Sequence, residues 1–270
     1  MSKEKRLIRF DWAMKYMLKD PSNYYIAEGF LCALLGEKNI TVKSILDSES
    51  NKTYPEDKFN RVDVLIEDSE GRNIIIEIQQ AYESDYLYRV LYGTSKHIAL
   101  SIRAGDSYRK IAKVISVSIV YFNLGIGEDY LYHGKTHFIG KTTGEEIHKD
   151  SEIVGKMKLL KNTNFNKISI YPEYYLIQID KYQDVVKETI DEWIYWFKND
   201  NVMEGSKSKH IDEVEKNLKI LHMPKEEQDN YKSYLERLAV DRNIWESAIE
   251  KGLKQGREEG IKKYSNGNNC

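Results

Sequence analysis

The chain has few cysteines and no long apolar run, and each shortage excludes a class of protein. Cys32 and Cys270 are too few for a disulfide framework and lack the spacing of a zinc site. No apolar run approaches the roughly 20 residues that cross a bilayer. The first residues, MSKEKRLIRF, contain no apolar signal segment. We therefore expect a cytoplasmic protein that does not enter a membrane.

The chain also has no excess of basic residues. Charged residues make up 31% of its 270 residues, and the formal net charge is −2. A nucleic-acid partner would therefore have to bind a local basic patch, because the overall charge does not attract it. The length allows one large domain, or one domain with an appendage.

Two apolar, β-branched segments, 61–67 and 73–80, form the most informative stretch of the sequence. The polar residues DSEGR lie between them and include Gly71, which can adopt a positive φ. This pattern predicts a β-hairpin.

The predicted hairpin brings acidic side chains together. A turn centred near Glu70 places Asp63 opposite Glu77 on the neighbouring strand. Because side chains alternate along a strand, Asp63, Glu77 and Gln79 are expected on one face. Two carboxylates would therefore converge beside an amide.

Carboxylates on apolar strands need compensation, because an ionised carboxylate taken out of water costs several kcal/mol. A divalent cation such as Mg²⁺ or Mn²⁺ would provide it and could activate a water for attack on a phosphodiester. Alternatively, the acids lie on a solvated face or pair with Arg61 or with a lysine elsewhere.

The flanking segments predict a mixed α/β sheet with helices on its faces. Residues 125–166 are rich in glycine and polar residues and are expected to form a loop. In the third predicted helix, Leu87, Val90 and Leu91 are expected to belong to the apolar stripe. The predicted helices are 10–17, 24–35 and 86–100, and the further strands are 40–46, 113–122 and 171–180.

Four charged residues outside the hairpin each have an interpretation that needs no active site. Asp11 and Lys15 are four residues apart, where they could simply pair on a helix. Glu28 could supply a third acid or occupy the boundary of an amphipathic helix. Arg89 could hold a phosphate through two hydrogen bonds or lie on the surface.

The last third of the chain has a different character. We expect a core domain of residues 1–182 and a helical region of residues 183–270 with a charged tail. Gly252, Gly256 and Gly260 recur every four residues in this tail. They favour either a helix contact in an oligomer or a frayed polar end.

Several short motifs in a fixed order carry a resemblance to a known family. They are DWAMK at 11–15, Asp63, EIQQ at 77–80, YRVLY at 88–92 and the strand KVISVSIVYF, followed by the tail EKGLKQGREEGIKK. Together they resemble the PD-(D/E)XK nuclease family transposases, also called recombination-promoting nucleases. The likeness covers most of residues 8–180 and the tail.

This resemblance implies a restriction-endonuclease-like core and Mg²⁺-dependent cleavage of double-stranded DNA, with Mn²⁺ as a substitute. It also implies a link to mobile elements or recombination. Asp63 and Glu77 would be metal ligands, with the backbone carbonyl of Ile78 as a third. Gln79 takes the place of the family's lysine, and an amide can orient a water but brings no charge.

The expected mode of DNA binding follows from the same comparison. Nothing in the sequence indicates that bases are read, so sequence specificity should be low. Cuts on both strands would need two active sites, which favours a homodimer. The expected DNA-binding residues are Lys15, Arg89 and Lys96, and the expected supporting residues are Asp11, Glu28 and Gln80.

Two other hypotheses remain open. The chain could be a catalytically inactive DNA-binding or partner-binding protein on the same fold. It could also be a structural protein that assembles through its helical last third, with the acids solvated.

Overall fold

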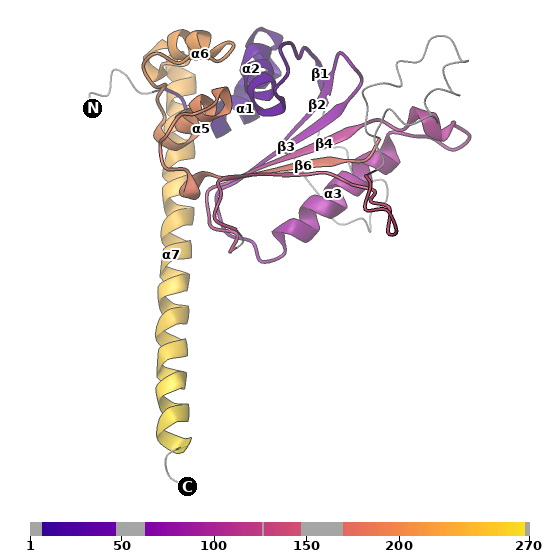
Figure 1. Ribbon diagram of the computed structural model, residues 1–270. Coiled ribbons are helices and arrows are strands. Elements are labelled where there is room, and N and C mark those ends of the chain that lie inside the picture. Colours follow the sequence, from indigo (N-terminus) through magenta and orange to yellow (C-terminus); the bar gives the residue numbers. More distant parts are fainter. Residues whose placement is uncertain (1–6, 47–62, 126, 147–169, 268–270) are drawn as a thin grey trace, which may run out of the picture. The chain divides into compact units, whose positions relative to one another are not determined.

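The computed structural model describes residues 7–46, 63–125, 127–146 and 170–267 (Figure 1). These residues fall into two compact units, one within Met1–Lys219 and one within Ile220–Cys270. The α-helices are α1 (Phe10–Tyr16), α2 (Tyr24–Leu35), α3 (Tyr86–Leu100), α5 (Thr189–Asn199), α6 (Ile211–Asn217) and α7 (Lys225–Gly267). The strands are β1 (Val42–Leu46), β2 (Val64–Asp68), β3 (Asn73–Gln79), β4 (Val114–Val120), β5 (Leu131–Gly134) and β6 (Glu173–Gln178). Short 3₁₀ helices span Met17–Lys19, Pro21–Asn23, Tyr108–Lys110, Ile179–Lys181 and Ile220–His222.

A six-stranded mixed sheet forms the centre of the first unit, with the strand order β1-β2-β3-β4-β6-β5. Strand β2 is antiparallel to both β1 and β3, whereas β3, β4 and β6 run parallel to one another. Strand β5 is antiparallel to β6 at the edge. Helices lie against this sheet (Figure 1), so the predicted α/β class is confirmed.

The predicted hairpin is confirmed, together with its register. Gly71 has φ +76° in the turn between β2 and β3. Val64 pairs with Ile76, and continuing this register by one residue sets Asp63 opposite Glu77. Because side chains alternate along strands, Asp63, Leu65, Ile75 and Glu77 belong to one face of the sheet.

Helix α3 covers this face. Its residue Ile98 packs on a buried cluster of Leu65, Ile75 and Val114. At its other end, Tyr86 and Val90 pack with Val120 and Phe122. The helix therefore lies over the same face as Glu77.

The expected apolar stripe of α3 was partly wrong. Val90 is buried, but Leu87 and Leu91 are 43% and 55% exposed. The buried residues of the helix are Tyr86, Val90, Gly93, Thr94 and His97. Helix α3 is rotated so that Tyr86 meets Phe122, which turns the two leucines to solvent.

Aromatic packing anchors α1. Phe10 stacks on Phe197 of α5 with ring centroids 3.7 Å apart, and it meets Phe30 of α2 edge-on at 5.3 Å. Trp196 of α5 approaches Phe10 at 5.4 Å. Such contacts between large buried rings hold this short helix rigidly. Helix α1 is therefore a firm platform for the side chains it carries.

One local expectation was wrong. Residues 131–134, expected in a loop, form the edge strand β5. This strand has only four residues and lies in a stretch rich in glycine, so it does not stand out in the sequence. Asn23 precedes α2 but does not cap it, because its amide donates to the carbonyl of Met17 at 3.0 Å.

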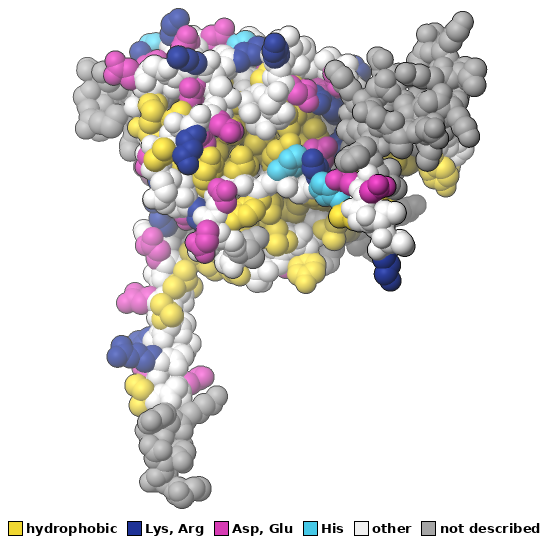
Figure 2. Space-filling view, in the orientation of Figure 1, with side chains coloured by type: hydrophobic (Ala, Val, Ile, Leu, Met, Phe, Trp, Pro, Cys, Tyr) yellow, Lys and Arg dark blue, Asp and Glu magenta, His cyan; other side chains and the backbone are white. Residues whose placement is uncertain are grey.

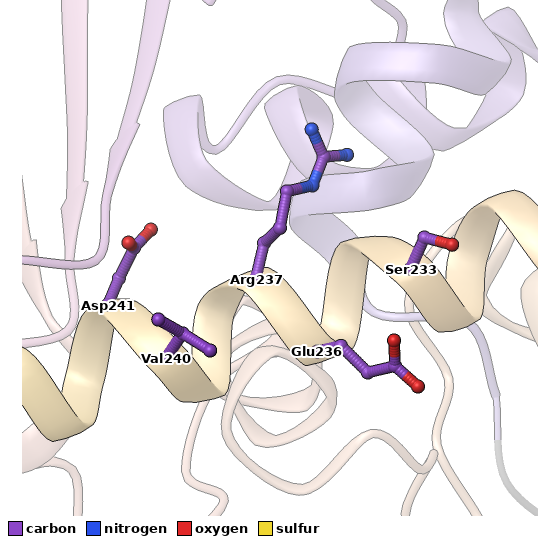
Figure 3. Close-up of a pocket in the computed structure, with 5 residues that line it drawn as sticks. All are labelled: Ser233, Glu236, Arg237, Val240 and Asp241. Carbon is purple, nitrogen blue, oxygen red and sulfur yellow. The ribbon is translucent and has the colours of Figure 1, made fainter.

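The second unit consists mainly of α7, which is 43 residues long. Val240, Ile244 and Leu253 are exposed on it, and Figure 2 shows apolar side chains between charged ones along this helix. Figure 3 shows a pocket that is lined by residues of α7 alone: Ser233, Glu236, Arg237, Val240 and Asp241.

Among the described helices, none combines the length and the hydropathy that a membrane span requires. The division into domains 1–182 and 183–270 stays a prediction.

Candidate active site

Asp63 lies just before β2 and is held by one contact on each carboxylate oxygen. Its Oδ2 accepts a hydrogen bond from the backbone N–H of Ile78 at 2.7 Å. Its Oδ1 lies 3.1 Å from Nζ of Lys15, which comes from α1. Both side chains are 27% exposed. Asp63 is therefore oriented toward β3 and remains accessible to solvent.

Glu77 is buried in the middle of the sheet, with only 4% of its surface exposed. Its Oε2 has no hydrogen-bond partner among the described residues. Burial raises the pKa of Glu77 to about 7; the charge of Arg89 lowers it, and that of Asp63 adds to the rise. A buried carboxylate oxygen without a hydrogen bond is costly, which favours a place where a ligand binds.

Arg89 of α3 connects three groups of the site. Its Nη2 lies 3.3 Å from Oε1 of Gln79 and 3.6 Å from Oε2 of Glu77. The same nitrogen is 3.2 Å from a carboxylate oxygen of Glu83. The guanidinium also lies over the ring of Tyr86, 5.2 Å from its centroid. Arg89 is therefore part of the site and not an isolated surface residue.

Two buried hydroxyl groups complete the surroundings of Glu77 and were not predicted. Ser118 of β4 pairs in register with Glu77, so both side chains point to the α3 face. Burial raises the pKa of the Tyr86 hydroxyl, and the nearby charge of Glu77 adds to this effect. A signal for Ser118 existed, because it is a polar residue in the middle of an apolar strand. No sequence pattern singled out Tyr86.

A second polar network ties α1 to the end of β3. Nε2 of Gln80 donates to Oδ2 of Asp11 at 2.8 Å, and Nε of Arg9 lies 3.2 Å from Oδ1 of the same carboxylate. Asp11 is fully buried. The interpretation that Asp11 simply pairs with Lys15 was wrong, because Lys15 reaches Asp63 instead. Asp11 and Lys15 lie on one face of α1, which points toward the hairpin, where Asp11 contacts Gln80 and Lys15 contacts Asp63.

The remaining predicted residues lie elsewhere. Oε1 of Glu28 accepts a hydrogen bond from the backbone N–H of Val42 at 2.8 Å, at the start of β1. Lys96 is half-buried on α3, seven residues after Arg89, which is about 10 Å along a helix axis. Arg61 lies outside the described residues. The structure thus brings together Asp63, Glu77, Ile78, Gln79, Arg89 and Lys15, with Asp11 and Gln80 behind them.

The donor atoms around Asp63 and Glu77 suit a hard divalent cation. Within the described ranges, no group of three or more His, Cys, Asp or Glu side chains is placed to hold a metal ion. Mg²⁺, however, commonly takes one or two carboxylates and keeps several waters. Two neighbouring carboxylates, one of them with a buried oxygen that forms no hydrogen bond among the described residues, fit that requirement.

The carbonyl of Ile78 adds a third oxygen on the same side. The carbonyl of Gln79 accepts from the N–H of Tyr121 at 3.0 Å and therefore points toward the β4 side. Successive carbonyls of a strand alternate, so that of Ile78 points the other way, to where Asp63 contacts its N–H. Side-chain and backbone oxygens thus share this edge.

Comparison with protein families gives one match that spans most of the chain. Residues 8–248 match the family described as PD-(D/E)XK nuclease family transposase. Comparisons with curated proteins and with solved structures gave no match.

Proposed function

Because the chain belongs to the PD-(D/E)XK nuclease family transposases, we propose that it is a metal-dependent endonuclease that hydrolyses phosphodiester bonds of double-stranded DNA with low sequence specificity. Family membership itself implies a nuclease linked to mobile elements. The observation that carries the finer proposal is that Oε2 of Glu77, beside Asp63, is buried and has no hydrogen-bond partner among the described residues.

Asp63 and Glu77 would hold Mg²⁺, or Mn²⁺ in its place, together with the carbonyl of Ile78. A bound cation of this kind lowers the pKa of a water and neutralises charge on the attacked phosphate. The protein keeps the two carboxylates in position: the N–H of Ile78 orients Asp63, and Arg89 restrains Glu77. Gln79 orients by hydrogen bonding only, because its amide carries no charge.

The DNA backbone would be bound by basic side chains near the hairpin. Arg89 is 27% exposed, and Lys96 follows it on α3. Contacts to phosphates position a duplex without reading its sequence, and they weaken steeply with salt. We expect no marked target sequence. Cleavage of both strands would require two copies of the site, so a homodimer is part of the proposal.

Nicking of supercoiled plasmid tests the proposal. The wild type should convert the plasmid with Mg²⁺ or Mn²⁺ and leave it intact in EDTA. Glu77→Gln and Asp63→Ala should each lower the rate by roughly 10³-fold, since losing a ligand of the cation removes several kcal/mol of transition-state stabilisation. Glu37→Gln is the matched control, because Glu37 follows α2 and pairs with Arg72 at the turn of the hairpin, at the end opposite to Asp63 and Glu77.

A second candidate function is DNA binding without turnover. It is favoured by the Lys15–Asp63 ion pair, which occupies one carboxylate, and by the amide at position 79. In that case the wild type would bind DNA, the Asp63→Ala variant would bind it equally well, and neither would nick the plasmid. Equal traces of nicking in the wild type and both variants would also contradict the nuclease proposal.

A further inference from the structure

Lys15 makes a closer contact with a predicted ligand of the cation than Arg89, the other predicted DNA contact that reaches one, which approaches Glu77 to 3.6 Å. Its Nζ lies 3.1 Å from Oδ1 of Asp63, whereas Gln79 at the strand position has no charge to offer. Charge-assisted contacts of this kind are about twice as strong as neutral ones. The site therefore contains a lysine ammonium, but α1 supplies it.

We propose that Lys15 is a catalytic residue that supplies, from α1, the positive charge that Gln79 cannot bring to the reaction. This assignment rests on the proposed nuclease function. With DNA bound, the ammonium contacts a non-bridging oxygen of the attacked phosphate, which lies next to Asp63. Lys15 keeps its proton throughout and stabilises the negative charge that develops on the phosphate.

The reaction is a simple hydrolysis. The oxygen of a water forms a bond to phosphorus and releases a proton to solvent, and the bond from phosphorus to the 3′ oxygen breaks. That oxygen takes up a proton and leaves as a 3′-hydroxyl, and a 5′-phosphate remains. The charge on the phosphate is greatest between these events, so a fixed cation beside it lowers the barrier.

The structure holds Lys15 ready for this role. Lys15 and Asp11 are four residues apart, so they share one face of α1. Asp11 accepts from Gln80, the residue directly after Gln79, and so ties that face to the end of β3. Phe10 anchors the same helix in the aromatic cluster. A cation held on a rigid element needs little reorganisation when the substrate arrives.

A plain phosphate contact makes a different prediction from a catalytic charge. A residue that only positions DNA contributes to affinity and to its salt dependence, by a slope of about 0.9 for each phosphate. A charge needed in the transition state contributes to the cleavage rate at saturating DNA. The two roles are separated by measuring binding and single-turnover cleavage on the same variants.

The experiment compares Lys15→Met, Lys15→Arg and the double variant Lys15→Met/Gln79→Lys with the wild type. Lys43→Met is the matched control, because Lys43 also pairs with an acid, Glu67, on an exposed part of the sheet. Single-turnover cleavage is measured with Mn²⁺ at saturating DNA. DNA affinity is measured in EDTA by fluorescence anisotropy, Mn²⁺ affinity by calorimetry without DNA, and folding by thermal unfolding.

We expect Lys15→Met to cleave roughly 100-fold more slowly, as when one stabilising group of a transition state is lost. It should bind Mn²⁺ more tightly, because its lysine no longer competes for Asp63, and its DNA affinity should change less than threefold. Lys15→Arg should recover part of the rate. The double variant should recover most of it, since a lysine at position 79 returns a charge to the same place.

Three results would overturn the assignment. If Lys15→Met cleaves at the wild-type rate but binds DNA more weakly, Lys15 only positions DNA. If Lys15→Met is slow and the double variant is equally slow despite normal unfolding, the charge is not what was lost. If the wild type itself cuts no DNA with either metal, the proposed function fails, and the assignment fails with it.

Discussion

The two ends of one β-hairpin each carry a buried acidic side chain, and the two differ in how far their oxygens are hydrogen-bonded. At the turn, Asp68 is 1% exposed, and both of its carboxylate oxygens have partners: the N–H groups of Glu70 and Arg72, and Nε of Arg72. Arg72 also donates twice to Glu37, at 2.5 and 3.0 Å. At the open end, Oε2 of Glu77 has no hydrogen-bond partner among the described residues.

This difference separates a structural charge network from one prepared for a ligand. A buried ion pair with every polar atom satisfied contributes to one defined fold and has no capacity left. At the open end, the site keeps a carboxylate whose pKa is raised to about 7, chiefly by burial. A buried carboxylate oxygen without a hydrogen bond lowers the stability of the fold. Native structures are expected to keep such an atom where a bound ligand provides the missing interaction.

Breaking the satisfied network should have the largest effect on stability. Arg72→Met leaves the buried carboxylate of Asp68 without its cation, and breaking a buried pair in this way costs about 3–5 kcal/mol. Arg89→Met at the open end should cost much less near pH 6, because Glu77 can take up a proton instead. Urea unfolding of both variants at pH 6 measures the difference. Equal losses would contradict the comparison.

Removing the charge of Glu77 should stabilise the protein without metal. Its pKa in the folded chain, about 7, exceeds the ordinary value of 4.5, so the folded state binds the proton more tightly and loses stability as the pH rises between these values. This difference corresponds to roughly 3 kcal/mol, of which losing the Arg89 contact offsets part.

Glu77→Gln should therefore raise the unfolding free energy by about 2 kcal/mol at pH 8 in EDTA and change it little at pH 4.5. Thermal unfolding across this range measures it, with Glu37→Gln as the control acid. A gain that is the same at both pH values would show that the ionisation of Glu77 is not its cause.

The link between α1 and β3 should have the smallest effect. Gln80→Ala removes the 2.8 Å hydrogen bond to Asp11 and should cost about 1–2 kcal/mol, since it leaves a buried carboxylate oxygen with one partner fewer. Cleavage should fall several-fold, because α1 positions Lys15 less firmly. Urea unfolding and single-turnover cleavage test the two effects. An unchanged rate would show that α1 stays in place without this link.

The hairpin could be predicted because its information is local. Two apolar, β-branched segments and a glycine turn set the register, and the register alone sets Asp63 opposite Glu77. The charged residues around the hairpin could be predicted as candidates, but their interaction partners could not. Asp11 and Lys15 look like partners on a helix, and only the approach of α1 to the hairpin turns them toward Gln80 and Asp63.

The face that a helix buries depends on what it meets. The sequence of α3 offers apolar residues on more than one face, and the meeting of Tyr86 with Phe122 selects the buried one. Ser118 owes its place beside Glu77 to parallel pairing of strands about 40 residues apart, which no local pattern encodes. Contacts between distant segments could therefore not be predicted from the sequence.

The hydrogen bond from Ile78 to Asp63 gives the site a built-in reporter. The amide proton of Ile78 points at a carboxylate rather than at another strand, so its magnetic resonance frequency follows the electron density on Asp63. The signal of this single backbone amide will therefore move whenever a cation or a new contact draws charge from that carboxylate. The occupancy of the site can then be followed in a cleavage-dead protein, without substrate turnover.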